Sequence, residues 1–229
     1  MSRIDALTTW AKVDLDAVEH NLKQVKDHLG AKSNIMAVVK ADAYGHGAVP
    51  IAKRAITSGV KMLAVATVEE GVELRKAGID VPILVLGTLL EEQLQKVIKY
   101  NLIAVIYTLS FAKRASKIAQ QLGKKIKVHL AVDTGMGRIG ILADKRPAAK
   151  IKGIMSLNSL EVNGLFTHFA VADENREYTN RQLEKFNTII ANLKDDGREI
   201  AIKHAANSAA IINYPEAHYD FVRLGIALY

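Results

Sequence analysis

The chain has 229 residues, 49% of them hydrophobic and 24% charged, which provides enough apolar material for one sizeable core and excludes a wholly disordered chain. It contains no cysteine, so disulfides, thiolate catalysis and sulfur-based metal sites are excluded, and we expect no metal site. The formal net charge of +7 is scattered along helix-like segments without a nucleic-acid-binding motif, so we expect a solvated basic surface and no nucleic-acid partner.

The N-terminal sequence, MSRIDALTTWAKVD, lacks the apolar region of a signal peptide. The longest apolar stretch, residues 81–90, is far shorter than the roughly 18 residues that indicate a membrane helix. We therefore expect a cytoplasmic protein that does not bind a membrane.

Short apolar, β-branched runs alternate along the chain with longer segments of helical spacing. A helix is predicted over residues 14–30, before the first strand, and further helices over 89–101 and 178–197, the last of them ended by Gly197. Eight strands are predicted, over residues 34–40, 62–67, 82–87, 102–108, 126–135, 161–170, 199–207 and 220–229.

Strands that are apolar on both faces and separated by helices indicate a parallel sheet. Eight such units favour a closed α/β barrel of the (β/α)8, or TIM, class over the alternative of an open, doubly wound sheet. We expect one domain over residues 1–229, with a short N-terminal segment and helix at about 1–33. The last residues, 223-RLGIALY-229, resemble an apolar strand without a closing helix, which predicts that the chain is a fragment of a longer protein.

Polar residues follow several of the predicted strands. Because functional groups of such barrels gather at the C-terminal ends of the strands, these residues are expected on one face. Each has an ordinary structural alternative: a surface lysine, a core histidine, a structural ion-pair arginine or a simple glycine turn. The candidates are Lys40, Tyr44, Arg138, His168, Asn207, Ser208 and Arg223.

Two features of these candidates indicate a particular cofactor. Ser208 is predicted to cap a helix over 209-AAIINY-214, near strands seven and eight, where this fold tends to hold phosphate. Gly225 allows close approach of backbone to an anion. A lysine amine such as that of Lys40 can form a Schiff base with a carbonyl cofactor. A phosphate pocket together with such a lysine predicts pyridoxal 5′-phosphate (PLP).

At this point the sequence resembles a known family, the alanine racemases, whose N-terminal domain is a PLP-binding barrel. The matching stretches are 38-VVKADAYGHG-47, 133-DTGMGRIG-140, 167-THFAVAD-173, 204-HAANSAA-210 and 223-RLGIALY-229. They occur in the family's order and extend over nearly the whole chain. The resemblance implies an isomerase that interconverts L- and D-alanine for D-alanine and peptidoglycan-precursor synthesis.

The resemblance also implies roles for the site residues. Lys40 is similar to the lysine that holds PLP and exchanges the α-proton on one face of the substrate. Arg138 is similar to the arginine that faces the substrate carboxylate, and Arg223 to the one that contacts the pyridine nitrogen. The other implied cofactor contacts are Tyr44, Leu86, His168, Asn207, Ser208, Gly225 and Ile226.

Two departures from the family pattern affect what is expected. Many members carry a carbamylated lysine that orients the arginine, but that position is Ala131 here, so Arg138 is expected to need another anionic partner such as chloride. The family's second base is a tyrosine of a C-terminal β domain delivered across a homodimer interface. That domain is expected to be absent from this chain, which would then be inactive or weak alone.

Three other functions fit parts of the pattern. A stand-alone PLP-binding barrel concerned with PLP homeostasis has a similar length. Another amino-acid racemase or decarboxylase can be built on the same barrel. A non-enzymatic barrel would leave the aligned polar residues unexplained.

Overall fold

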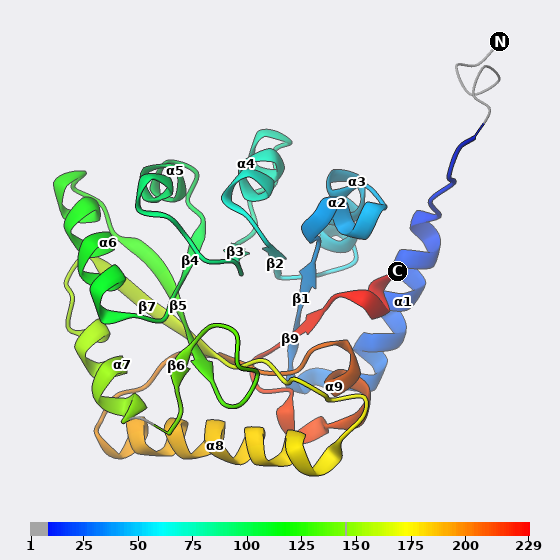
Figure 1. Cartoon of the computed structure of the whole chain (residues 1–229). Helices are drawn as coiled ribbons and strands as arrows, with labels where there is room; N and C mark the ends of the chain where they lie inside the picture. Colours follow the sequence, from blue (N-terminus) through cyan, green and yellow to red (C-terminus); the bar gives the residue numbers. More distant parts are fainter. Residues whose placement is uncertain (1–8, 145) are drawn as a thin grey trace.

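The computed structural model describes residues 9–144 and 146–229 and shows a barrel of strands surrounded by helices (Figure 1). Residues 1–8 of the predicted N-terminal segment, and residue 145, lie outside the described residues. In the part of the chain that the structure describes, no helix is both long enough and apolar enough to cross a membrane.

The barrel is closed and all its strands are parallel. Its eight strands are β1 (Asn34–Val38), β2 (Met62–Val65), β3 (Ile83–Val85), β4 (Ile103–Ile106), β5 (Ile126–Asp133), β7 (Leu160–Phe166), β8 (Ile202–His204) and β9 (Phe221–Leu224). The ring closes because β1 pairs with both β2 and β9, while β4 pairs with β5. A two-residue strand, β6 (Ile141–Leu142), pairs with the C-terminal end of β5. The predicted (β/α)8 barrel is therefore confirmed, and the open sheet is excluded.

Helices cover the outside of the ring (Figure 1). They are α1 (Leu15–Leu29), α3 (Ala48–Thr57), α4 (Val68–Lys76), α5 (Leu94–Lys99), α6 (Leu109–Gln121), α7 (Pro147–Met155), α8 (Arg176–Asp195) and α9 (Ser208–Asn213). The segment labelled α2 (Lys40–Gly45) is a left-handed turn and not a regular α-helix, because its residues 41–44 have positive φ angles. Side-chain caps fix where several begin: Asp14 caps α1, Thr67 and Glu70 form a capping box on α4, and Asn175 caps α8. The predicted helix over 89–101 is instead a 3₁₀ turn, Glu91–Gln93, followed by the short α5.

Alternate residues of each strand face opposite sides, which produces two apolar layers. Met36 and Val38 of β1 point into the barrel, where they pack with residues such as Leu84 and Phe166. Ile35 and Ala37 belong instead to the larger cluster between the strands and the helices. This double burial explains why the strands read as unbroken apolar runs.

Several strands end earlier than predicted at their C-terminal ends, where functional groups gather in barrels of this class. The run predicted as a strand over 161–170 leaves the sheet after Phe166, which places His168 in a loop. The run over 220–229 ends as a strand at Leu224 and continues as a 3₁₀ turn, Ile226–Leu228, so the prediction of a strand to the last residue is wrong. The Leu228 N–H donates to the carbonyl oxygen of Gly225 at 2.8 Å, so this N–H closes a turn and does not pair with a neighbouring strand.

Candidate active site

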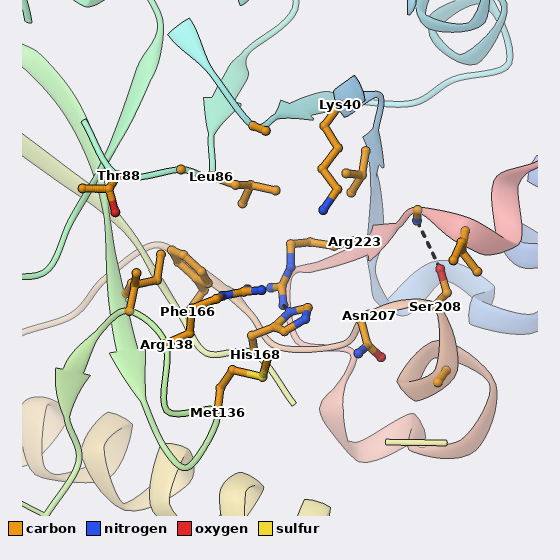
Figure 2. Close-up of a pocket in the computed structure, with 18 of the residues that line it drawn as sticks. Lys40, Leu86, Thr88, Met136, Arg138, Phe166, His168, Asn207, Ser208 and Arg223 are labelled. Atoms are coloured by element: carbon orange, nitrogen blue, oxygen red, sulfur yellow. Dashed lines mark hydrogen bonds between the residues drawn. The ribbon is translucent and has the colours of Figure 1, made fainter. Parts of the chain in front are cut away.

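One cavity of about 660 Å³ opens at the C-terminal ends of the barrel strands. Figure 2 shows side chains from several strand ends converging on it, with the amine of Lys40 directed into its centre. Every residue predicted for the site lines this cavity: Lys40, Tyr44, Leu86, Arg138, His168, Asn207, Ser208, Arg223, Gly225 and Ile226. Ala131, at the position of the missing lysine, lines it as well. The structure thus brings together residues that lie far apart in the sequence: Lys40 and Ile226, for example, are separated by 186 positions.

Lys40 is followed by an unusual left-handed turn. Ala41, Asp42, Ala43 and Tyr44 have φ angles of 50°, 52°, 54° and 54°, which is the region that costs a non-glycine residue about 1–2 kcal/mol. Across this turn, the Lys40 amine lies 5.7 Å from the ring centre of Tyr44. Both side chains therefore reach the same cavity. The periodicity of the sequence gave no signal for this conformation.

Hydrogen bonds to neighbouring elements hold the strained turn. The Asp42 carboxylate accepts from the Ala48 N–H at 2.6 Å, at the start of α3. The Ala41 N–H donates to the Glu70 carboxylate of α4 at 2.8 Å. Because α3 and α4 are both packed on the barrel, the turn is fixed from two sides and the strain is tolerated.

Arg223 lies inside the barrel, 4% exposed, with most of its donors already used. Its Nη1 contacts His204 Nδ1 at 2.7 Å, and its Nη2 contacts His168 Nδ1 at 3.0 Å. Nη2 also lies within hydrogen-bond distance of the carbonyl oxygens of Thr167 and Ala205, at 2.9 and 2.8 Å, so its two N–H groups are shared among three acceptors. Among the described residues, no partner occupies Nε–H, which leaves that donor for a ligand in the cavity.

The guanidinium of Arg223 fixes the protonation of the histidines around it. Arginine can only donate, so Nδ1 of both His168 and His204 must accept and lack a proton. His204 Nε2 then donates to His129 Nδ1 at 2.9 Å, so the proton of His129 is on Nε2. That buried Nε2 has no partner among the described residues.

Burial and nearby positive charges lower the pKa values of the histidines and the arginine in this cluster. Burial, together with the charges of Arg223, Arg138 and Lys40, lowers the pKa of His168 to about 3. Burial and the charge of Arg223 lower the pKa of His129 to about 4 and that of His204 well below its usual value. Burial, with the charge of Arg138, lowers the pKa of Arg223 to about 9, so this arginine remains charged at neutral pH.

Ser208 has a different local role from the predicted one. The N-cap of α9 is Asn207, whose side-chain oxygen accepts from the Ala210 N–H at 3.0 Å. Ser208 is the first residue of the helix, and its hydroxyl oxygen accepts from the N–H groups of Gly225 and Ala227, each at 3.2 Å. Asparagine caps helices as well as serine does, so the sequence could not rank the two. Ser208 instead joins α9 to the turn after β9 (Figure 2).

The family described as "Alanine racemase, N-terminal domain" matches residues 13–229. The chain belongs to the alanine racemase family.

Individual relatives agree with this assignment. The alanine racemase of Desulforamulus reducens is 45% identical over 221 residues, which cover 96% of this chain and 60% of that protein. The structure of alanine racemase from Clostridium difficile 630 in complex with cycloserine is 41% identical, with a TM-score of 0.95, covering 98% of this chain and 62% of that one. A histidine racemase from Leuconostoc mesenteroides subsp. sake is 34% identical, with a TM-score of 0.86, covering 94% of this chain and 57% of that one.

Two points follow from membership of the alanine racemase family. The resemblance drawn from the sequence motifs is confirmed, while the individual roles of the site residues stay predictions. The chain spans about 60% of the length of the curated relatives it matches. The activity of a whole alanine racemase is therefore a matter for proposal.

The cavity fits the cofactor that the family uses, PLP. It presents a lysine amine at its centre and positive groups from Arg138 and Arg223. A side chain at position 225 would place its Cβ 3.0 Å from the Tyr44 hydroxyl, so glycine keeps that wall open to an anion. Leu86 and Phe166 supply apolar surface for an aromatic ring.

The structure also places residues that sequence reasoning missed. His129 and His204 lie in apolar strands, and their positions gave no sign that they contact Arg223 through a chain of hydrogen bonds. Met136 and Thr88 line the cavity as well. The anion expected beside Arg138, in place of the lysine absent at Ala131, stays a prediction.

Proposed function

We propose that this chain is the PLP-binding barrel of an alanine racemase that interconverts L- and D-alanine as a homodimer. The observation that supports this most strongly is the position of the Lys40 amine, in one cavity with the donors expected for a phosphorylated aromatic cofactor and a carboxylate. The names of the relatives support alanine as the substrate.

The residues of this chain would hold PLP at three places. Tyr44, Asn207, Ser208 and the backbone at Gly225 and Ile226 would surround its phosphate. The apolar side chain of Leu86 and the imidazole of His168 would contact the ring. Lys40 would hold the cofactor covalently through Nζ. Bound PLP would supply an electron sink for the charge that develops when an amino acid loses its Cα proton.

Arg223 would tune that chemistry through its remaining donor. Its Nη groups are engaged by His204, His168 and backbone carbonyls, which leaves Nε–H to face the pyridine nitrogen. Because Arg223 donates and cannot accept, the ring nitrogen facing it would be held unprotonated. This weakens the electron sink, which disfavours transamination and favours return of the proton to Cα.

Proton transfer needs two groups because racemisation removes a proton on one face and returns it on the other. Lys40 would take up or return the Cα proton on one face. The second group, by the family resemblance, would be a tyrosine of a C-terminal domain from the other subunit. Arg138 would bind the substrate carboxylate at the open side of the cavity.

The test is reductive labelling of the lysine. We expect purified protein with added PLP to show a near-visible absorbance band that borohydride removes, with the adduct on the peptide containing Lys40. Lys40→Ala should abolish both the band and the adduct. Lys53→Ala, which removes an exposed lysine of α3, should change neither. An adduct distributed over surface lysines, or a band unchanged by Lys40→Ala, would refute the assignment.

A second experiment separates a racemase from a PLP-binding barrel without racemase activity. The gene extended by a family C-terminal domain should restore growth of a D-alanine auxotroph, and the 229-residue chain should not. Rescue by the extended gene that is lost with Lys40→Ala supports the racemase. Lysine labelling without rescue by the extended gene would favour the stand-alone barrel, and turnover of histidine in preference to alanine would favour a different substrate.

A further inference from the structure

The loop that carries Arg138 has little side-chain support of its own. Among the described residues, no hydrogen bond or ion pair holds the Arg138 guanidinium, and its side chain is exposed at the cavity. The position of this group must therefore be set by the backbone of the loop between β5 and β6, residues 134–140. That backbone contains Gly135, Gly137 and Gly140, all at positive φ, and glycine is the residue with the most conformational freedom to lose.

Part of the support comes from within the loop. The Asp133 carboxylate accepts from the N–H of Gly135 at 2.9 Å and from that of Gly137 at 3.1 Å. These bonds fix the curvature of the loop. Because Asp133 is the last residue of β5, these bonds join the loop only to the strand that precedes it, and they do not link it to the other loops around the cavity.

Helix α8 supplies the external support through Tyr178. The Tyr178 hydroxyl donates to the carbonyl oxygen of Gly135 at 2.6 Å, and Asn175, which caps α8, accepts from the Tyr178 N–H. A Cβ at position 135 would lie 2.7 Å from that hydroxyl, so the glycine is what lets the helix approach the loop.

Gln182, one turn further along α8, joins the same loop to the loop that carries His168. Its side chain is 1% exposed, and its amide nitrogen contacts Thr134 Oγ1 at 3.3 Å and the His168 carbonyl at 3.1 Å. Its amide oxygen accepts from the Ala170 N–H at 2.9 Å. Thr134 and Thr167 also share a hydrogen bond of 2.7 Å between the two loops.

We propose that Tyr178 and Gln182 are positioning residues that set where Arg138 meets the substrate carboxylate. They touch neither the cavity nor any reacting atom. They act by fixing the position of the loop after β5 relative to the loop after β7. This role rests on the proposed function, because it assigns Arg138 to the substrate.

The test compares two variants, each of which removes the hydroxyl group of one half-buried tyrosine. Tyr178→Phe removes the donor to Gly135, whereas Tyr219→Phe removes a bond of the same 2.6 Å length, to Asn187, away from the cavity. Hydrogen exchange on the cofactor-free protein should show faster exchange of residues 134–140 in Tyr178→Phe, by roughly 3- to 10-fold, which is the value of one hydrogen bond. Tyr219→Phe should leave that segment unchanged.

Kinetics of the complete enzyme then separate positioning from general weakening. Tyr178→Phe should raise KM for alanine by roughly 3- to 10-fold, with kcat and the cofactor absorbance nearly unchanged. Gln182→Met should loosen residues 167–172 as well as 134–140, and its KM should rise further. Equal exchange in the two tyrosine variants, or a loss confined to kcat, would overturn the proposal.

The hydrogen-exchange result can be interpreted whether or not the proposed function is correct. If Lys40 formed no adduct with PLP, the proposed function would fail while faster exchange in Tyr178→Phe still established the support of the loop by α8. Faster exchange with unchanged KM in an active enzyme would instead reject the positioning role alone.

Discussion

His129 has room for its ring in the barrel interior because residue 164, on the neighbouring strand, is a glycine. A Cβ built on Gly164 would overlap the imidazole of His129, which is fully buried. The pairing between β5 and β7 shifts register at this point, between Val128 and His129. Close approach of backbone to a ring is a frequent reason for glycine inside a strand.

Gly164→Ala should therefore destabilise the protein by about 1–3 kcal/mol or more, because neither the strand nor the ring can move far in a filled barrel. Gly153→Ala is the matched control: it lies in α7, and its added Cβ would make ordinary contacts of 3.6 Å. The control should stabilise by roughly 0.5–1 kcal/mol through helix propensity. Urea unfolding of both variants checks this, and equal effects of the same sign would contradict the steric argument.

At the scale of single residues, the sequence predicted the groups at strand ends better than those within strands. Lys40 and Arg138 were predicted because each is a charge that follows an apolar run. Arg223 lies within β9 and was predicted because it opens a stretch, 223-RLGIALY-229, that resembles the family. His129 and His204 were missed because a histidine inside an apolar strand looks the same whether or not it contacts an arginine. The cap of α9 was misassigned by one residue because Asn207 and Ser208 are chemically equivalent as caps.

The left-handed turn after β1 is the element most at odds with ordinary backbone preferences. Ala41→Gly should relieve about 1–2 kcal/mol of strain, partly offset by about 0.5–1 kcal/mol of added chain entropy in the unfolded state. We expect a net stabilisation of up to about 1.5 kcal/mol, measured by urea unfolding.

The control for that prediction is an exposed alanine in a regular helix. Ala191→Gly, in α8, should destabilise by about 1 kcal/mol because glycine is a poor helix former. Opposite signs for the two substitutions would establish that Ala41 is strained. Destabilisation by both, to the same extent, would show that the turn carries no strain that glycine relieves.

Among the elements, the alternation of strands and helices could be predicted, whereas the ends of the strands could not. Apolar periodicity continues past Phe166 and Leu224 because the loop residues that follow are themselves buried, such as Phe169 and Leu228. Burial without sheet pairing is decided by tertiary contacts. For the same reason the two-residue β6 had no sequence signal.

For the whole molecule, neutral histidines that lie beside a charged arginine predict sensitivity to acid. Unfolded histidines bind protons near pH 6.5, whereas folding lowers the pKa of His129 to about 4 and that of His168 to about 3. Between these values the unfolded state binds more protons, so stability falls as the pH falls. Each histidine should cost about 2 kcal/mol at pH 5 relative to pH 7.

Urea unfolding at pH 7 and pH 5 measures this loss. We expect roughly 4 kcal/mol from the two histidines together, and more if His204 contributes. Equal stability at the two pH values would mean that these imidazoles are not held neutral in the folded protein.

The closed topology has a consequence for how the protein is made. β1 pairs with β9 through contacts such as Asn34 with Phe221, so the first strand must wait for a partner that the ribosome adds 187 residues later, 221 minus 34. At typical synthesis rates that delay is about 10–40 s. During it, one edge of β1 is unpaired and can join other nascent chains. Chaperone protection of the growing chain should therefore affect the yield of this barrel more than that of a protein whose early strands pair with one another.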